Sequence, residues 1–312
     1  AVLYGVKPAV VAIVLAAAWR IGSRTLRNAA LWAIAVAAFV SLFAFSAPFP
    51  LVILVAAILG AAGGRIAPRL FALSKHGAGP ATHASIIDDD TPTPAHARFS
   101  AAKLAAIVAA FLALWAAALG ALALALGWQD ALTQMGWFFT KAALLTFGGA
   151  YAVLPYVLQG AVEHYGWLTA PQMIDGLALG ETTPGPLIMI VAFVGYLGAA
   201  TAGAIVATFF TFLPSFLFIL AGGPLVERTR DDVKLTAPLT AITAAVVGVI
   251  VNLAVFFGWH VFWPGGFDIA ACAIATIATV VLVTNRAQVI PVIAASGAAG
   301  LALWALGLQG AV

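Results

Sequence analysis

Two pairs of segments in this chain repeat one another, and each pair is aligned on a matching proline. The matched segments are 5–17 with 235–247, aligned on Pro8 and Pro238, and the stretches that begin at Phe49 and at Ile290, aligned on Pro50 and Pro291. One structural unit is therefore predicted to occur twice. The second copy is preceded by residues 136–235, which have no counterpart before Ala1, so we expect the first copy to be truncated on its N-terminal side.

Long apolar runs fill most of the chain. Hydrophobic residues make up 64% and charged residues 8%, whereas a soluble domain carries roughly 25% charge. About 20 apolar residues cross a bilayer as a helix. Ten runs are candidates for such a crossing, namely 3–20, 29–47, 49–64, 104–127, 136–158, 171–200, 203–224, 236–257, 267–284 and 287–308. The sequence therefore predicts an all-α polytopic membrane protein.

Basic residues are concentrated in alternate connections between these runs. They gather at Arg20/Arg24/Arg27, at Arg65/Arg69/Lys75/Arg98/Lys103, at Arg228/Arg230/Lys234 and at Arg286. The connections 46–50, 127–130 and 258–268 contain no Lys or Arg. Because basic loops tend to stay on the cytoplasmic side of a membrane, we expect the basic connections in the cytoplasm and the other three in the periplasm.

This orientation predicts that the two copies are inverted relative to each other. The run with Pro8 ends at the cytoplasmic Arg20, whereas its counterpart with Pro238 starts at the cytoplasmic Lys234. Inverted repeats with broken helices are an architecture of secondary transporters, whose site lies near the middle of the membrane. The predicted parts are 1–64 as the truncated first repeat, 65–103 as a cytoplasmic linker, 104–130 as a connecting span and 131–312 as the complete second repeat.

The linker is polar and carries histidines and acids. It contains His76, His83, His96 and the run Asp88–Asp90, but their spacing matches no common metal-ligand pattern. We therefore interpret residues 74–100 as a solvated, partly disordered linker. Neither a metal nor another cofactor is expected.

The apolar run 136–158 is interrupted at Gly148–Gly149. At 1.5 Å per residue, the helix before these glycines is about 18 Å long, or about half a membrane. Broken backbone at membrane depth is tolerated only where protein or water covers it. This interruption therefore predicts a discontinuous helix beside a cavity.

A second interruption lies in run 171–200. Thr169 and Gln172 form a capping-box pattern, which predicts that a helix begins there. Pro184-Gly185-Pro186 removes backbone donors and disfavours helix before each proline, so the helix is expected to end near Thr183. A second half-helix can start at Pro186. The N-terminus of such a half-helix presents free N–H groups and a positive dipole end, which suit an anion.

The motifs at these breaks resemble the chromate transporter family in its long, two-half ChrA form. They are residues 138–156, with the core KAALLTFGGAYAVLPY, then EHYGWLT at 163–169 and GLALGETTPGPL at 176–187, and YGVKPAVVAIVLAAAWRIG at 4–22 resembles the later part of the first half. The resemblance implies export of chromate across the bacterial inner membrane, with sulfate as a tetrahedral look-alike. We expect an oxyanion and the lipid bilayer as partners and no nucleic acid, and the sequence leaves a homo-oligomer open.

Candidate substrate-binding residues cluster at the two breaks. They are Lys141, Thr146, Phe147, Gly148, Gly149, Thr182, Thr183, Pro184, Gly185 and Pro186. Lys141 either points at the site or extends back to the membrane interface beside Trp137. The threonine hydroxyls either donate to an oxyanion or cap backbone carbonyls.

Glu181 is the candidate residue for proton coupling or gating. An ionisable group near the middle of a membrane is costly and usually functional, although Glu181 could instead be a structural partner of the helix break. Asp175 is expected to face water and Lys7 to anchor the outer end of its span. His164 and His260 are interpreted as loop histidines.

No motif of a familiar enzyme is present, so no catalytic residue and no enzymatic activity are predicted. Two alternatives to chromate export remain open. One is a proton-coupled transporter of another small anion such as sulfate. The other is an intramembrane enzyme that uses Glu181 and Asp175, although two acids six residues apart lie on opposite faces of a helix.

Overall fold

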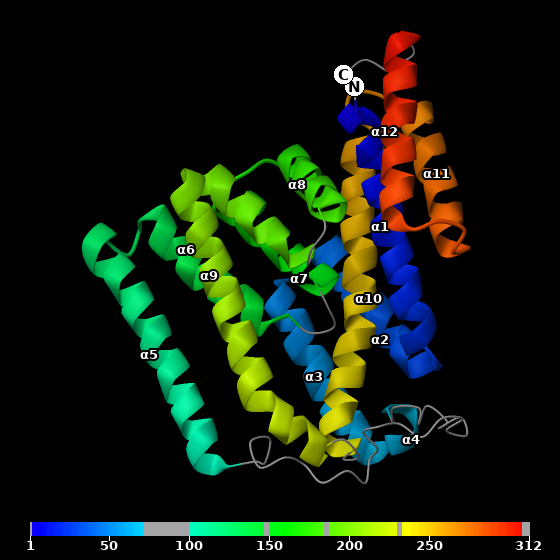
Figure 1. The fold of residues 1–312 in the computed structure, drawn as a ribbon. Coiled ribbons are helices and arrows are strands. Elements are labelled where there is room, and N and C mark those ends of the chain that lie inside the picture. Colours follow the sequence, from blue (N-terminus) through cyan, green and yellow to red (C-terminus); the bar gives the residue numbers. More distant parts are fainter. Residues whose placement is uncertain (1, 72–99, 147–149, 184–186, 230–232, 308–312) are drawn as a thin grey trace, which may run out of the picture.

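The computed structural model describes residues 2–71, 100–146, 150–183, 187–229 and 233–307, and this part of the chain is helical without strands. Residues 72–99 of the predicted linker 65–103 lie outside these ranges, including its histidines and Asp88–Asp90, whereas 65–71 belong to the end of α3 and to α4, and 101–103 to the start of α5. Figure 1 shows the described helices as two groups with short helices between them. The all-α class predicted from the sequence is confirmed.

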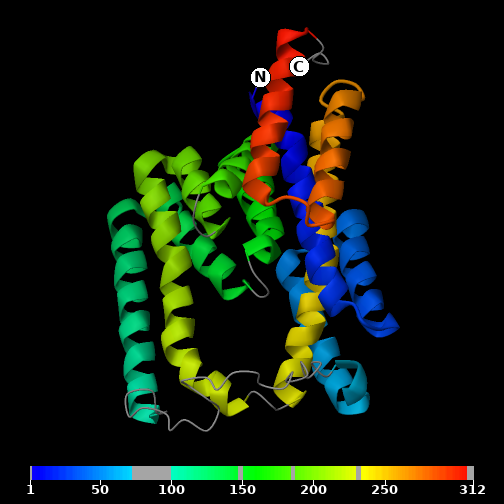
Figure 2. The same cartoon turned by 45° about the vertical axis from the view of Figure 1, so that its right-hand side comes forward.

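The first group contains the helices of both repeated segments. It consists of α1 (Val2–Thr25), α2 (Ala29–Phe45), α3 (Phe49–Ile66), the short α4 (Pro68–Phe71), α10 (Val233–Phe262), α11 (Ile269–Val283) and α12 (Val289–Ala305). The second group consists of α5 (Ala101–Leu126), α6 (Ala131–Leu144) and α9 (Ile190–Thr229). Between the groups lie α7 (Ala150–Leu158), the π-helix η1 (Gln159–His164), α8 (Ala170–Thr182) and the 3₁₀-helix η2 (Leu187–Met189), as Figures 1 and 2 show.

Five stretches of the described chain are helical, long and apolar enough to cross a membrane. They are Val2–Thr25, Phe49–Ile66, Ala101–Leu126, Leu187–Gly222 and Thr236–Phe262, and α2, α11 and α12 are shorter apolar helices. The chain is therefore a polytopic membrane protein. The predicted run 136–158 is divided between α6 and α7, and run 171–200 is divided between α8 and the beginning of α9.

Helix α9 folds back on itself near its beginning. Ala199 and Ala200 have non-helical backbone angles, with a φ of 49° at Ala200. A Cβ atom on Gly195 would lie 2.3 Å from the carbonyl oxygen of Gly203. Eight residues of straight helix would instead place these positions about 12 Å apart. Glycine at both positions therefore allows the two arms of α9 to meet, and the turn falls at the end of the predicted run 171–200.

The two repeated segments pack against each other in a reciprocal way. Helix α1 packs against α10, α11 and α12, whereas α10 packs against α1, α2 and α3. Figure 1 shows α1 leading away from the end of the molecule that carries both labelled termini, whereas α10 leads toward it. Pro8 lies inside α1 and Pro238 inside α10.

An aromatic core joins α6 to the short helices in the middle of the molecule. The ring of Phe138 stacks on that of Tyr156 with their centroids 4.9 Å apart, and Tyr165 stacks on Trp167 at 4.4 Å. Phe138 and its neighbour Phe139 are fully buried. Rings of this size hold α6 against α7 and η1, and one cavity lies beside them.

The interpretation of His260 as a loop residue is wrong. Helix α10 continues to Phe262, and the Nδ1 atom of His260 lies 2.9 Å from the carbonyl oxygen of Phe256 inside that helix. The predicted loop 258–268 therefore starts only at Trp263. The helix ends there because Pro264 follows, and proline disfavours helical backbone at the residue before it.

Candidate functional site

The ends of α8 agree with the sequence prediction. Thr169 and Gln172 form a reciprocal capping box, in which the Thr169 N–H donates to Gln172 Oε1 at 2.8 Å and the Gln172 N–H donates to Thr169 Oγ1 at 3.4 Å. The helix ends at Thr182, with Thr183 as its C-cap. Local side-chain chemistry therefore sets both ends of α8. Six of the predicted site residues lie outside the described part of the chain, namely Phe147, Gly148, Gly149, Pro184, Gly185 and Pro186.

The hydroxyl groups of the three predicted threonines donate to the backbone. Thr182 and Thr183 both donate to the carbonyl oxygen of Leu179, at 2.9 and 2.7 Å. Thr146 donates to the carbonyl oxygen of Ala142 at 2.7 Å. The described arrangement is therefore the capping alternative, in which these protons are not directed at an oxyanion.

Lys141 extends from α6 into a cavity of about 530 Å³. Its ammonium nitrogen also lies 5.5 Å from the centre of the Trp137 ring, within the range of a cation–π contact. The ammonium group thus lies both at this cavity and beside the Trp137 ring. The cavity is lined by Pro48, Pro50, Phe138, Lys141, Leu144, Leu145, Tyr156, Gln159, Gly160, His164 and Tyr165.

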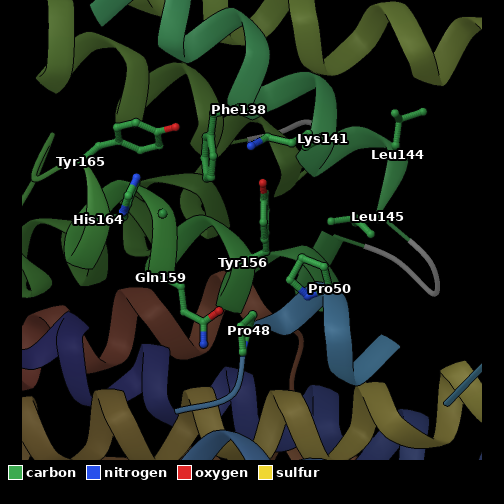
Figure 3. Close-up of a pocket in the computed structure, with 11 residues that line it drawn as sticks. Pro48, Pro50, Phe138, Lys141, Leu144, Leu145, Tyr156, Gln159, His164 and Tyr165 are labelled. Carbon is green, nitrogen blue, oxygen red and sulfur yellow. The ribbon is translucent and has the colours of Figure 1, made fainter. Parts of the chain in front are cut away.

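Tyr156 supplies a second polar group to this cavity. Figure 3 shows its hydroxyl group and the Lys141 ammonium group directed toward the same part of the space. Among the described residues, neither group has a carboxylate partner. The ion pair in this part of the chain joins Lys7 to Asp175. An ammonium group and a phenol hydroxyl are both hydrogen-bond donors. This end of the cavity therefore presents positive charge and donors between aromatic walls.

Gln159 closes the other end of the cavity by joining η1 to the start of α3. Its Oε1 atom accepts the Phe49 N–H at 3.1 Å, and its Nε2 atom donates to the carbonyl oxygen of Ala47 at 3.3 Å. Phe49 is fully buried. Residues 46–50, predicted as a connection without basic residues, thus bring Pro48 and Pro50 into the cavity wall.

The sequence reasoning missed most of the residues that line this cavity. The interpretation of His164 as a loop residue is wrong, because it is the last residue of the π-helix η1 and lines the cavity. Tyr165 also lines the cavity, and its hydroxyl donates to Gln134 Oε1 at 3.2 Å. The sequence feature that could have indicated them is the polar and aromatic composition of 156–165. In the structure part of this stretch is a π-helix, and π-helical turns occur frequently at functional sites.

Glu181 is bonded to a tyrosine of the neighbouring helix. The hydroxyl group of Tyr151 in α7 donates to Glu181 Oε1 in α8. Both residues are partly buried. The carboxylate of Glu181 is thus held next to a hydroxyl group that itself carries a proton, and the contact joins the two helices on either side of η1.

The expectation for Asp175 is wrong, and its partner is Lys7. Asp175 does not simply face water, because its Oδ1 atom lies 3.3 Å from the Nζ atom of Lys7 in α1. The two side chains are 25% and 30% exposed. Packing of α8 on α1 brings the two charges together, and a half-buried charge is far less costly when it is paired.

No group of three or more His, Cys, Asp or Glu residues with metal-site geometry is found in the described ranges. The polar side chains that line the cavity are Lys141, Tyr156, Tyr165, Gln159 and His164. This set offers no carboxylate to balance a cation, and it favours an anionic ligand.

Comparison with known proteins finds a family and several relatives. A family model described as "Chromate transporter" matches residues 133–301, which is more than half of the chain. A chromate transport protein of Pseudomonas aeruginosa is 39% identical over 167 residues, which are 51% of this chain and 39% of that protein. A chromate transport protein of Cupriavidus metallidurans is 37% identical over 124 residues, or 40% of this chain and 31% of that protein.

A third relative is shorter. The uncharacterized transporter YwrA of Bacillus subtilis is 30% identical over 124 residues, which are 39% of this chain and 67% of that protein. The chain thus spans well under half of the two chromate transport proteins that it matches. No solved structure matches this chain.

Proposed function

The chain belongs to the chromate transporter family, and from this we propose that it forms part of a path by which chromate leaves the cell across the bacterial inner membrane. The relatives named chromate transport proteins support the substrate. The apolar helices support a multi-pass membrane protein. Sulfate has the same tetrahedral shape and charge as chromate and is proposed as its competitor.

The observation that carries this proposal is the cavity beside Lys141. A dianion that loses part of its hydration shell in the cavity can contact the ammonium group of Lys141 and the hydroxyl group of Tyr156. Two unit charges 4 Å apart attract by about 4 kcal/mol at the effective dielectric constant near a protein surface, and a second negative charge raises this further. About 530 Å³ also leaves room for water around the ion. The cavity can thus hold an oxyanion without dehydrating it completely.

We propose Glu181 as the group that couples transport to protons. Its carboxylate accepts a hydrogen bond from the Tyr151 hydroxyl group in the described arrangement. Protonation of Glu181 would weaken that bond, because a neutral carboxyl group is a poorer acceptor than a carboxylate. The contact joins α7 to α8, so a change in protonation would alter how these helices pack beside the cavity.

We further propose alternating access between two inverted repeats. The reciprocal packing of α1 on α11 and α12, and of α10 on α2 and α3, supports this architecture. The candidate residues at the two breaks, Phe147–Gly149 and Pro184–Pro186, belong to the proposal as backbone that approaches the ion. Helix α6 and both arms of α9 would then move together, relative to the group of helices built on α1 and α10.

Transport is favoured over enzymatic chemistry by the pairing of the acids. Asp175 forms an ion pair with Lys7 of α1, and Glu181 accepts a hydrogen bond from Tyr151 of α7, so the two carboxylates have different partners on different helices. A catalytic pair would need both groups at one reacting atom. We therefore propose that the protein is not an enzyme.

Transport into proteoliposomes tests this proposal. Purified protein would be assayed with chromate, sulfate and phosphate under an imposed pH gradient. Lys141→Gln should reduce chromate flux at least tenfold, Lys141→Arg should retain part of it, and Lys103→Gln on the exposed start of α5 should behave as the unmodified protein. Equal flux through the Lys141→Gln variant would contradict the site, and preference for sulfate or phosphate over chromate would select the other-anion alternative.

A further inference from the structure

A second cavity lies where α1 ends and α10 begins, away from Lys141. Its volume is about 380 Å³, and it is bounded by the end of α1, the connection to α2, α4 and an early part of α10. Figure 1 shows α4 beside the lower part of α10 at this end of the molecule. Three arginines line the cavity, Arg24, Arg27 and Arg69, and no acidic residue is among its described lining residues.

Hydrogen bonds to backbone carbonyl groups fix the segments that carry these arginines relative to one another. The Nε atom of Arg27 donates to the carbonyl oxygen of Arg24 at 2.8 Å. Asn28 donates from Nδ2 to the carbonyl oxygen of Leu70 at 2.8 Å, which fixes α4, and with it Arg69, beside the start of α2. Three arginines from three segments thus line one cavity. Like charges placed together repel one another, and a bound anion removes that repulsion.

Arg24 and Arg69 have no carboxylate partner in the described part of the chain. The start of α2 adds to the positive field, because Asn28 is the N-cap of this 17-residue helix and accepts the Leu31 N–H at 3.1 Å. A helix N-terminus attracts anions. Guanidinium groups bind phosphate oxygens in pairs of parallel hydrogen bonds, which makes arginine a common phosphate ligand.

We propose that this cavity binds the phosphate group of an anionic phospholipid. Exposed apolar side chains at its rim favour a lipid over free phosphate. Leu70 and Leu239 line the cavity and are 41% and 49% exposed, and Ile66, just before α4, is 83% exposed. Such side chains would contact acyl chains while the arginines hold the headgroup.

The level of the cavity in the membrane agrees with this assignment. Trp32, one turn into α2, is 56% exposed, and exposed tryptophans are typical of the membrane interface. The charge distribution predicts that Arg24 and Arg69 are cytoplasmic, the side on which anionic lipids attract basic residues. The lipid would clamp α1, α2 and α4 to α10, and so join the two repeated segments.

Binding of defined lipids to the purified chain tests the proposal. Native mass spectrometry in a neutral detergent would compare phosphatidylglycerol with phosphatidylcholine, with and without inorganic phosphate as competitor. The test variant is Arg24→Gln with Arg69→Gln, and the control is Arg286→Gln, an exposed arginine of the α11–α12 connection. Since each basic residue near a lipid surface contributes roughly fivefold, the double variant should lose about 25-fold in affinity for phosphatidylglycerol.

A second readout separates binding from general charge effects. Phosphatidylglycerol should raise the thermal unfolding temperature of the unmodified protein and of Arg286→Gln, but not that of the double variant. Equal binding of phosphatidylglycerol by the double variant would overturn the site. If inorganic phosphate displaced the lipid at a concentration comparable to that of the lipid, the cavity would not prefer the lipid. That result would overturn the lipid as its occupant. Neither result depends on whether chromate is transported.

Discussion

Lys7 and Asp175 form an ion pair that joins α1 to α8, with 3.3 Å between Nζ and Oδ1. Helix α1 belongs to the first repeated segment, whereas α8 precedes the second. The pair therefore ties the short helices beside the cavity to the group of helices built on α1 and α10. Charged residues make up only 8% of the chain, and this is the one ion pair between residues that the structure describes.

Removal of either partner of this pair should destabilise the protein. We expect Lys7→Met and Asp175→Asn each to lower the thermal unfolding temperature, and a double-mutant cycle to give a coupling of about 1 kcal/mol, near the upper end for pairs that keep some contact with solvent. Size-exclusion chromatography after heating, in detergent, measures the shift. Lys103→Met is the matched control, because Lys103 is exposed. Strictly additive single effects would show that the two charges do not interact.

Replacement of Glu181 should separate proton coupling from anion binding. Glu181→Gln keeps the shape of the side chain and removes its titration, so it should abolish the response of flux to a pH gradient while chromate still binds. Tyr151→Phe removes the hydroxyl donor and should shift the pH dependence without abolishing it. Unchanged pH dependence in well-folded Glu181→Gln vesicles would leave Glu181 with a structural role alone.

The features predicted well from the sequence depend on neighbouring residues. The capping box of Thr169 and Gln172 and the end of α8 at Thr182 follow from side chains within one or two turns. The class of protein follows from the length of its apolar runs.

The features that the sequence did not predict depend on tertiary packing. The contact of Lys7 with Asp175 requires α1 to lie on α8, and no local pattern encodes that distance. The same holds for Gln159, whose bonds to residues 47 and 49 bring the start of α3 to the cavity. Periodicity identifies an apolar face but not its partner, so the cavity wall could not be assembled from it.

The turn within α9 should be sensitive to a single methyl group. A Cβ atom on Gly195 would lie 2.3 Å from the backbone oxygen of Gly203, so Gly195→Ala should cost roughly 1–3 kcal/mol of stability, as overpacked sites do. The control is Gly120→Ala in α5, where a Cβ atom would meet nothing within 4 Å. A loss of folded protein for the first variant and not for the second is the expected result, and equal unfolding temperatures would contradict the close approach of the two arms.

Labelling of single cysteines checks the predicted topology. Arg65 in the last turn of α3 and Gln129 between α5 and α6 are both exposed. Figure 1 shows the end of α3 next to α4 and the connection from α5 to α6 at opposite ends of the molecule. In a Cys272→Ala background, which removes the native thiol, a cysteine at position 129 should react with an impermeant reagent on intact cells, whereas one at position 65 should be protected. The reverse pattern would invert the orientation.

The hydroxyl group of Tyr156 should contribute to anion affinity without contributing to packing. Tyr156→Phe keeps the ring that stacks on Phe138 at 4.9 Å and removes a hydroxyl group directed into the cavity with Lys141. Loss of one such hydrogen bond to a charged ligand is worth about 1.5–3 kcal/mol, or roughly 10- to 150-fold in chromate affinity. Tyr165→Phe is the control, because the Tyr165 hydroxyl already donates to Gln134. Isothermal titration with chromate should therefore show a weaker Kd for the first variant and little change for the second. If both variants bound chromate as the unmodified protein does, the ion would have to bind away from the ring of Tyr156, and the Lys141 cavity would no longer be the site.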